Sequence, residues 1–133
     1  MIKRLVAIFL LAFGTNYIWE HLHSVLYAHY KGGPITEFIL ARATLADAVL
    51  ITLISMPFLL RERLAKRSWL IIIIGIVVSI GIEEHALTTG RWAYTAVMPV
   101  IPLLHTGLTP TIQIGLLGYF CYLLTVRIFK QSE

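Results

Sequence analysis

The chain has 133 residues, of which 58% are hydrophobic and only 14% are charged, and its formal net charge is +4. A soluble domain of this length has about a quarter of its residues charged, so the composition excludes an ordinary soluble protein and indicates one integral-membrane domain over residues 1–133. The basic residues flank apolar runs and form no patch interleaved with aromatic residues, which predicts no nucleic-acid partner.

Four apolar runs predict four membrane-spanning helices. In chain order they cover about residues 5–27, 35–60, 69–87 and 110–129. Each run has roughly the 20 residues that a helix rising about 1.5 Å per residue needs to cross a hydrocarbon core of about 30 Å. Two glycines and a proline in segment 31–34 separate the first two runs and favour a turn there.

The stretch before the last run differs from the other connections. Residues 96–104 are apolar but too few to cross the bilayer, and Pro99 and Pro102 interrupt any helix. We therefore expect an interfacial or re-entrant segment here. The predicted fold class is an all-α, polytopic membrane protein, a four-transmembrane-helix bundle with this short segment before the last helix.

The placement of charge predicts the orientation of the bundle. Of the 11 Lys and Arg residues, all but Lys31, Arg42 and Arg91 lie near the two termini or in the loop 61–67. Because cytoplasmic segments are enriched in basic residues, both termini and this loop are predicted to be cytoplasmic. The sequence thus predicts a multi-pass protein of the plasma or inner membrane, N-in and C-in.

Three charged residues inside the predicted helices fall at one depth. Counting about 1.5 Å per residue from the cytoplasmic boundary puts Glu20 at about 22 Å and Glu83 at about 21 Å. Arg42 enters from the other side and lies about 10 Å below the outer boundary, at nearly the same height. A charge in hydrocarbon costs at least about 2.5–3.5 kcal/mol, so we expect Arg42 to pair with Glu20 or Glu83. Asp47 and Asn16 match one layer deeper and are expected to pair with each other.

Helical spacing places these groups on inward faces. Asn16, Glu20 and His23 follow one another at helical i, i+4 and i+3 spacing. Small residues, which allow close helix approach in lipid, precede Glu83 on the third helix and recur on the fourth. They are Gly75, Ser79, Gly115 and Gly118. Gln113, one turn inside the outer boundary of the fourth helix, is expected to join the polar layer.

The spacing Glu20-x-x-His23 matches half of the motif found in di-metal four-helix carboxylate proteins. The other half is absent, because Glu84 and His85 are adjacent and the fourth helix has no carboxylate. A mononuclear zinc or iron site is still compatible with the residues, with His23 and His85 as ligands together with Glu20 and either Glu83 or Glu84. The alternative is that the histidines lie at the interface and are satisfied by water and lipid head groups.

A second chemical interpretation needs no metal. Carboxyl groups paired in an apolar pocket resist ionisation, because desolvation and like charge both disfavour the charged form. One of Glu20, Glu83 and Glu84 would then be a catalytic acid that protonates an alkene or activates a hydroxyl group, with Arg42 orienting charge. Six further residues are candidate substrate-binding groups, namely Asn16, Asp47, Arg91, Trp92, Tyr94 and Gln113. For the aromatic residues among them, the alternative is a simple anchor at the membrane interface.

The function class that these features favour is a membrane-embedded enzyme acting on a lipid or isoprenoid by acid/base or metal-assisted chemistry. One alternative is a carrier or channel for protons or a divalent cation, which would need polar residues to continue toward the cytoplasm. Few lie below Asn16 and Asp47. Another is a structural or partner-binding subunit, since stripes of small residues also serve homo-oligomers and heteromeric partners. Membrane lipids are the expected neighbours in every case.

Overall fold

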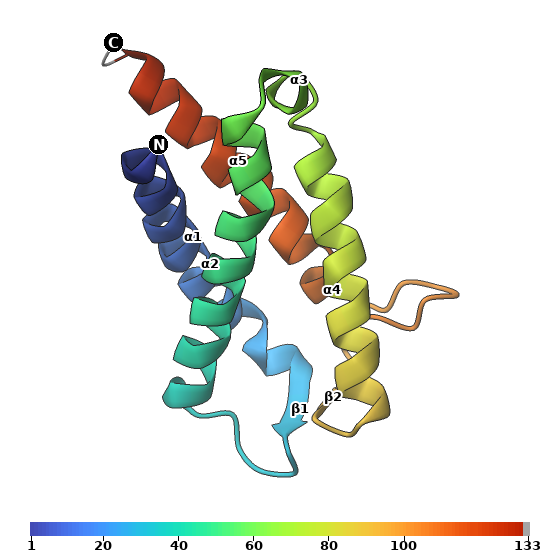
Figure 1. The fold of residues 1–133 in the computed structure, drawn as a ribbon. Coiled ribbons are helices and arrows are strands. Elements are labelled where there is room, and N and C mark those ends of the chain that lie inside the picture. The colour runs from blue at the N-terminus through green and yellow to red at the C-terminus, as the bar shows by residue number, and fades with distance from the viewer. Residues whose placement is uncertain (132–133) are drawn as a thin grey trace.

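The computed structural model describes residues 1–131 and is dominated by four long helices (Figure 1). Its elements are α1 (Ile2–His23), a 3-10 turn (Ser24–Leu26), β1 (Tyr27–Tyr30), α2 (Glu37–Leu60), α3 (Glu62–Ala65), α4 (Leu70–Thr88), β2 (Trp92–Tyr94) and α5 (Leu108–Gln131). By length and composition, four helical segments are able to cross a membrane: Ile2–Leu26, Glu37–Leu60, Leu70–Thr88 and Leu108–Gln131. The helical architecture predicted from the apolar runs is therefore confirmed.

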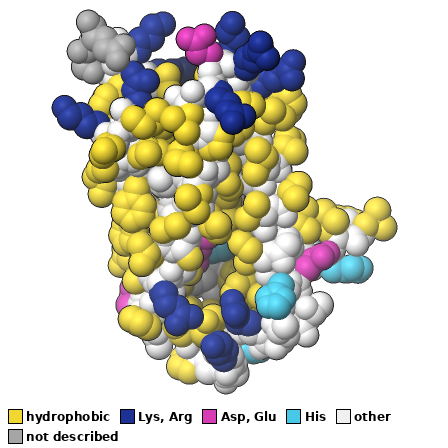
Figure 2. All heavy atoms as spheres, viewed as in Figure 1, with side chains coloured by type: hydrophobic (Ala, Val, Ile, Leu, Met, Phe, Trp, Pro, Cys, Tyr) yellow, Lys and Arg dark blue, Asp and Glu magenta, His cyan; other side chains and the backbone are white. Residues whose placement is uncertain are grey.

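The two ends of the bundle differ in content. The start of α1, the short helix α3 and the end of α5 lie at one end, which we call the termini end, and β1 and β2 lie at the other, the sheet end (Figure 1). Figure 2 shows Lys and Arg side chains at both ends and a largely apolar surface between them. Such a band of apolar surface between two charged ends suits a bundle that spans a bilayer. The N-in and C-in orientation stays a prediction.

A short two-stranded sheet corrects the purely helical prediction. The first helix was expected to continue to residue 27, but α1 ends at His23 and Tyr27 begins β1. The strands β1 and β2 are antiparallel, with Tyr27 opposite Tyr94 and Tyr30 opposite Trp92. The Tyr30 and Trp92 rings stack at a centroid distance of 6.4 Å. Cross-strand aromatic pairs of this kind stabilise extended backbone, which explains why the helix stops.

The segment before the last helix forms a loop that projects sideways from the bundle (orange in Figure 1). It is closed by an isolated bridge between Val100 and Gly107 and by the bond from Leu108 N–H to the Pro99 carbonyl. Its tip is apolar, because Leu103 is 94% exposed. The loop agrees with the expected non-spanning segment, and its position at the membrane interface stays a prediction.

Apolar side chains fill the half of the bundle nearer the termini. Ile8, Ile51, Ile71 and Cys121 belong to one buried cluster that joins all four long helices. Buried polar residues concentrate in the half nearer the sheet, where they include Asn16, His23, Glu83 and Gln113. The candidate site therefore lies in the sheet half of the bundle.

Candidate functional site

A cavity of about 280 Å³ lies at the sheet end, lined by α1, α2, α4, α5 and the two strands. Figure 2 shows the hollow on the face between α2 and α4, with carboxylate and histidine side chains inside it and basic side chains near its rim. Glu20, Arg42 and Glu83, which the sequence placed at one depth, all line it. Asp47 and Gln113 line it as well. The volume is just below the usual range for ligand pockets, which is about 300–1,000 Å³.

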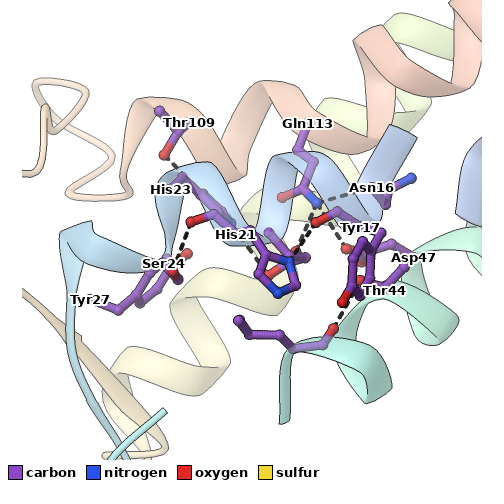
Figure 3. A network of polar contacts seen from close by, with 12 residues as sticks. Asn16, Tyr17, His21, His23, Ser24, Tyr27, Thr44, Asp47, Thr109 and Gln113 are labelled. Carbon is purple, nitrogen blue, oxygen red and sulfur yellow. Dashed lines mark hydrogen bonds and ion pairs between the residues drawn. The ribbon is translucent and has the colours of Figure 1, made fainter. Parts of the chain in front are cut away.

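One amide group organises the polar wall of this cavity. Gln113 Nε2, on α5, lies 2.8 Å from Glu20 Oε1, 2.9 Å from Asp47 Oδ2 and 2.9 Å from Asn16 Oδ1 (Figure 3). The Asn16 amide donates in turn to the Ala12 carbonyl at 2.7 Å, which fixes its oxygen toward Gln113. We call Asn16, Glu20, Asp47 and Gln113 the Gln113 network. It joins α1, α2 and α5 at one level.

The Gln113 network has more acceptors than its amide can serve. The Gln113 side-chain nitrogen has two hydrogens, but three oxygen atoms surround it. Glu20 Oε1 and Asp47 Oδ2 lie 2.8 Å and 2.9 Å from the same nitrogen, so the two carboxyl groups are close neighbours. Like charges this close in a desolvated site disfavour ionisation of both groups. We therefore expect the Glu20–Asp47 pair to hold one proton.

His23 connects this acid pair to the start of α5. Its Nε2 lies 3.4 Å from Glu20 Oε2 and its Nδ1 lies 3.1 Å from Thr109 Oγ1. The imidazole is only 6% exposed and packs edge-on against the rings of Trp19 and Tyr27. A buried imidazole with a polar partner on each nitrogen is placed to pass a proton to or from Glu20.

Glu83 lies in a separate group of aromatic donors, which we call the Glu83 cage. Its carboxylate accepts hydrogen bonds from Tyr94 Oη at 2.5 Å, Trp92 Nε1 at 3.2 Å and Tyr27 Oη at 3.3 Å. Burial, followed by the neighbouring Glu83 carboxylate, raises the pKa of both Tyr27 and Tyr94, so both phenols keep their protons and donate. Three donors occupy the oxygens of Glu83. The cage thus ties α4 to the sheet.

Replacing Tyr94 with phenylalanine tests the structural role of the cage. The change removes the donor at 2.5 Å from Glu83 and the acceptor for the Gly107 N–H, which lies 2.8 Å from Tyr94 Oη. Because hydrogen bonds to charged groups contribute about 1.5–3 kcal/mol, we expect the free energy of unfolding in detergent to fall by that amount. Tyr17→Phe is the control, since that hydroxyl makes only an exposed 3.5 Å contact to Glu37. Equal stability of the two variants would contradict this role.

Within residues 1–131, Arg42 pairs with no carboxylate, which corrects the expected ion pair with Glu20 or Glu83. Its Nη2 donates to Tyr30 Oη at 2.8 Å, and its guanidinium lies 6.0 Å from the centre of the Tyr30 ring. Because the side chain is long, the guanidinium of Arg42 lies nearer the sheet end than the Arg42 Cα atom does. Asp47 and Asn16 likewise meet through Gln113 and not directly.

The four-ligand metal site predicted from the sequence is not assembled. Glu20 and His23 contact each other, but Glu84 and His85 are exposed on α4. Among residues 1–131, no group of three or more His, Cys, Asp and Glu side chains is arranged to hold a metal ion. Adjacent positions on a helix point about 100° apart, so Glu83 faces inward while Glu84 and His85 do not. Arg91 and Trp92 line the cavity, and Tyr94 reaches it only through Glu83.

Three residues of the site were not identified from the sequence as functional. Tyr30 positions Arg42, Thr109 contacts His23, and the buried hydroxyl of Ser79 lines the cavity with no hydrogen-bond partner in the described part of the chain. The alternation of Trp92 and Tyr94 was a usable signal for a strand. No comparable signal marks Thr109 or Ser79.

No protein-family model, curated protein or solved structure matches this chain. The chemistry of the cavity is what bears on function. A protonated carboxyl pair, apolar walls and two arginines, Arg42 and Arg91, meet around one space. This combination suits a ligand that is mostly hydrocarbon and that reacts with an acid.

Proposed function

We propose that the chain is a membrane-embedded enzyme that binds a lipid or isoprenoid in the cavity and acts on it with the Glu20–Asp47 pair as acid and base. The observation that carries this proposal is the approach of both carboxyl groups to the one Gln113 nitrogen, at 2.8 Å and 2.9 Å, in the wall of a cavity of about 280 Å³. A carboxylic acid that stays protonated in an apolar site is a recognised general acid. Gln113 supports this role, since its N–H groups can stabilise the carboxylate that forms when the proton leaves.

The proposed reaction is a shift of a carbon–carbon double bond. The acid O–H bond breaks as the electron pair of the alkene takes the proton, which leaves a carbocation and a carboxylate. A carboxylate of the same pair then removes a proton from the neighbouring carbon, and that C–H electron pair forms the new double bond. Protons balance, and no oxidant or reductant is needed. His23 can return a proton to Glu20 if the pair loses one to water.

In the predicted orientation, the cavity lies in the outer half of the bilayer. Its opening between α2 and α4 (Figure 2) faces sideways, so a lipid could enter from the membrane without crossing water. The channel alternative is less favoured, because the half of the bundle nearer the termini is filled by residues such as Ile8, Ile51 and Ile71. Only isolated buried hydroxyls, such as Ser55 and Thr125, interrupt that packing.

Deuterium uptake from solvent tests this proposal without knowledge of the product. The purified protein is incubated in D₂O with farnesol and with a total lipid extract, and mass spectrometry counts deuterium at carbon-bound positions. The wild type is expected to introduce deuterium into an isoprenoid or lipid alkene. Asp47→Asn should reduce the rate by at least about 100-fold, the range that general acid–base groups contribute. Its amide can still donate to Glu20, so the fold should be kept.

Glu37→Gln is the matched control for Asp47→Asn. It makes the same carboxyl-to-amide change on the same helix, but Glu37 is exposed and contacts His21 outside the cavity. Its rate should equal that of the wild type. The proposal is wrong if the wild type introduces no deuterium into any lipid, or if Asp47→Asn keeps the full rate.

A further inference from the structure

Two basic residues of the sheet end contact one tyrosine. Lys31 Nζ lies 5.6 Å from the centre of the Tyr30 ring, and Arg42 donates to the Tyr30 hydroxyl. Arg42 and Arg91 line the cavity, and Lys31 does not. The Tyr30 ring also stacks on Trp92, so the group that positions Arg42 is itself held by the sheet. The cavity therefore has a cationic rim of two arginines.

No carboxylate neutralises this rim in the part of the chain that the structure describes. The nearby carboxylates have other partners, since Glu37 pairs with His21 at 2.8 Å and Glu83 accepts three aromatic donors. The Arg42 guanidinium donates a hydrogen bond to the neutral Tyr30 hydroxyl. A guanidinium at a membrane interface with only a neutral partner has donors left for an anion.

The rest of the cavity is suited to hydrocarbon. Its walls include Ile39, Leu50, Ile82 and Ile114, from three different helices. Ser79 is 3% exposed, lines the same space, and has no partner for its hydroxyl among residues 1–131. A buried hydroxyl left without a partner is uncommon, and it points to a ligand or water that completes the site.

We propose that the ligand is a single-chain amphiphile whose phosphate or diphosphate head group binds Arg42 and Arg91 while its hydrocarbon chain fills the cavity. This inference rests on the proposed function, and it adds the substrate class. The two arginines match phosphate oxygens, because each guanidinium can donate two parallel hydrogen bonds. Arg42 and Asp47 are five residues apart on α2, about 7.5 Å along the helix axis. The reacting double bond therefore lies a short hydrocarbon segment away from the head group.

Binding of three defined probes tests this inference. Farnesyl phosphate, farnesol and inorganic phosphate are titrated against the purified protein in neutral detergent at low ionic strength. The wild type should bind farnesyl phosphate at least about tenfold more tightly than farnesol, and added salt should reduce this preference. Arg42→Gln/Arg91→Gln should lose the preference and keep its farnesol affinity. Inorganic phosphate should not displace farnesyl phosphate, and displacement at similar concentrations would show a free-anion site and overturn the inference.

Lys31→Gln is the control, because Lys31 shares the Tyr30 ring but does not line the cavity. It should keep the preference for farnesyl phosphate. Equal wild-type affinity for farnesol and farnesyl phosphate, or a preference that survives in the double arginine variant, would overturn the inference. Asp47→Asn separates the two proposals, since it should bind farnesyl phosphate normally. If deuterium uptake fails while the preference for farnesyl phosphate holds, only the proposed chemistry is wrong. If deuterium uptake occurs without that preference, only the proposed binding of a phosphate head group is wrong.

Discussion

Replacing Gly75 with alanine is expected to prevent the bundle from assembling. A methyl group on Gly75 would overlap the Cα and backbone N of Gly115, and one on Gly115 would lie 2.5 Å from the Ile72 carbonyl oxygen. Backbone atoms cannot rotate away as a side chain can, so α4 and α5 would have to separate. The cost should reach or exceed the upper end of the about 1–3 kcal/mol that overpacking costs. Unfolding in a denaturing detergent, and the monodisperse fraction after purification, would measure it.

The same helix provides the control. Gly81, also on α4, has no atom within 4 Å of an added methyl group, so Gly81→Ala should be neutral or stabilising by up to about 1 kcal/mol, the helical preference for alanine. Gly118→Ala should lie between the two, because its methyl group would meet only side chains, Ile71 at 3.3 Å and Ile51 at 3.5 Å. If Gly75→Ala is as stable as Gly81→Ala, α4 does not pack on α5 as closely as in the structure.

This packing also sets the geometry of the site. Gly75, Ser79 and Glu83 are spaced by four on α4, so the face that meets α5 continues to the cavity wall and the cage. Separation of α4 from α5 would therefore move Ser79 and Glu83 away from Gln113. A partly folded Gly75→Ala variant should accordingly show weaker ligand binding, with the loss growing as the helices separate.

The sequence predicted the helices well because a membrane span has a length and composition that are readable locally. Stripes of small residues predicted close helix approach, and this is confirmed where α4 packs on α5 at Gly75 and Gly115. The strand at Tyr27 was missed because its partner Tyr94 lies far along the chain, and pairing overrides the helical tendency of the residues before it.

The approximate height of the site residues in the bundle was predictable from the sequence, but the direction of their side chains was not. Helical rise gives the height of a Cα atom, and it placed Asp47 and Asn16 one layer deeper than Glu20. In the structure the side chains of all three residues meet at Gln113. Helical rise also did not predict the partner of Arg42, whose long side chain reaches Tyr30. The expectation of a shared proton follows from two carboxyl groups at one amide nitrogen, which spacing in the sequence does not show.

Replacing Gln113 with leucine should destabilise the protein more than any other single polar substitution in the site. Leucine has a similar volume, but it removes the donor that contacts Asn16, Glu20 and Asp47. Because each buried acceptor left without a donor costs about 1–3 kcal/mol, the free energy of unfolding should fall by at least about 3 kcal/mol. Thr111→Val, two residues earlier on α5, removes one bond to Thr106 and should cost only about 1 kcal/mol.

A double variant tests whether the loss comes from orphaned acceptors. Asp47→Leu removes one of the acceptors that Gln113→Leu leaves without a donor. The combined variant should therefore be more stable than the sum of the two single losses, by about 0.5–3 kcal/mol, which is typical of residues in one network. Strictly additive losses would mean that the two side chains act independently. Glu20 and Asp47 would then lack the shared donor on which their proposed role as acid and base depends.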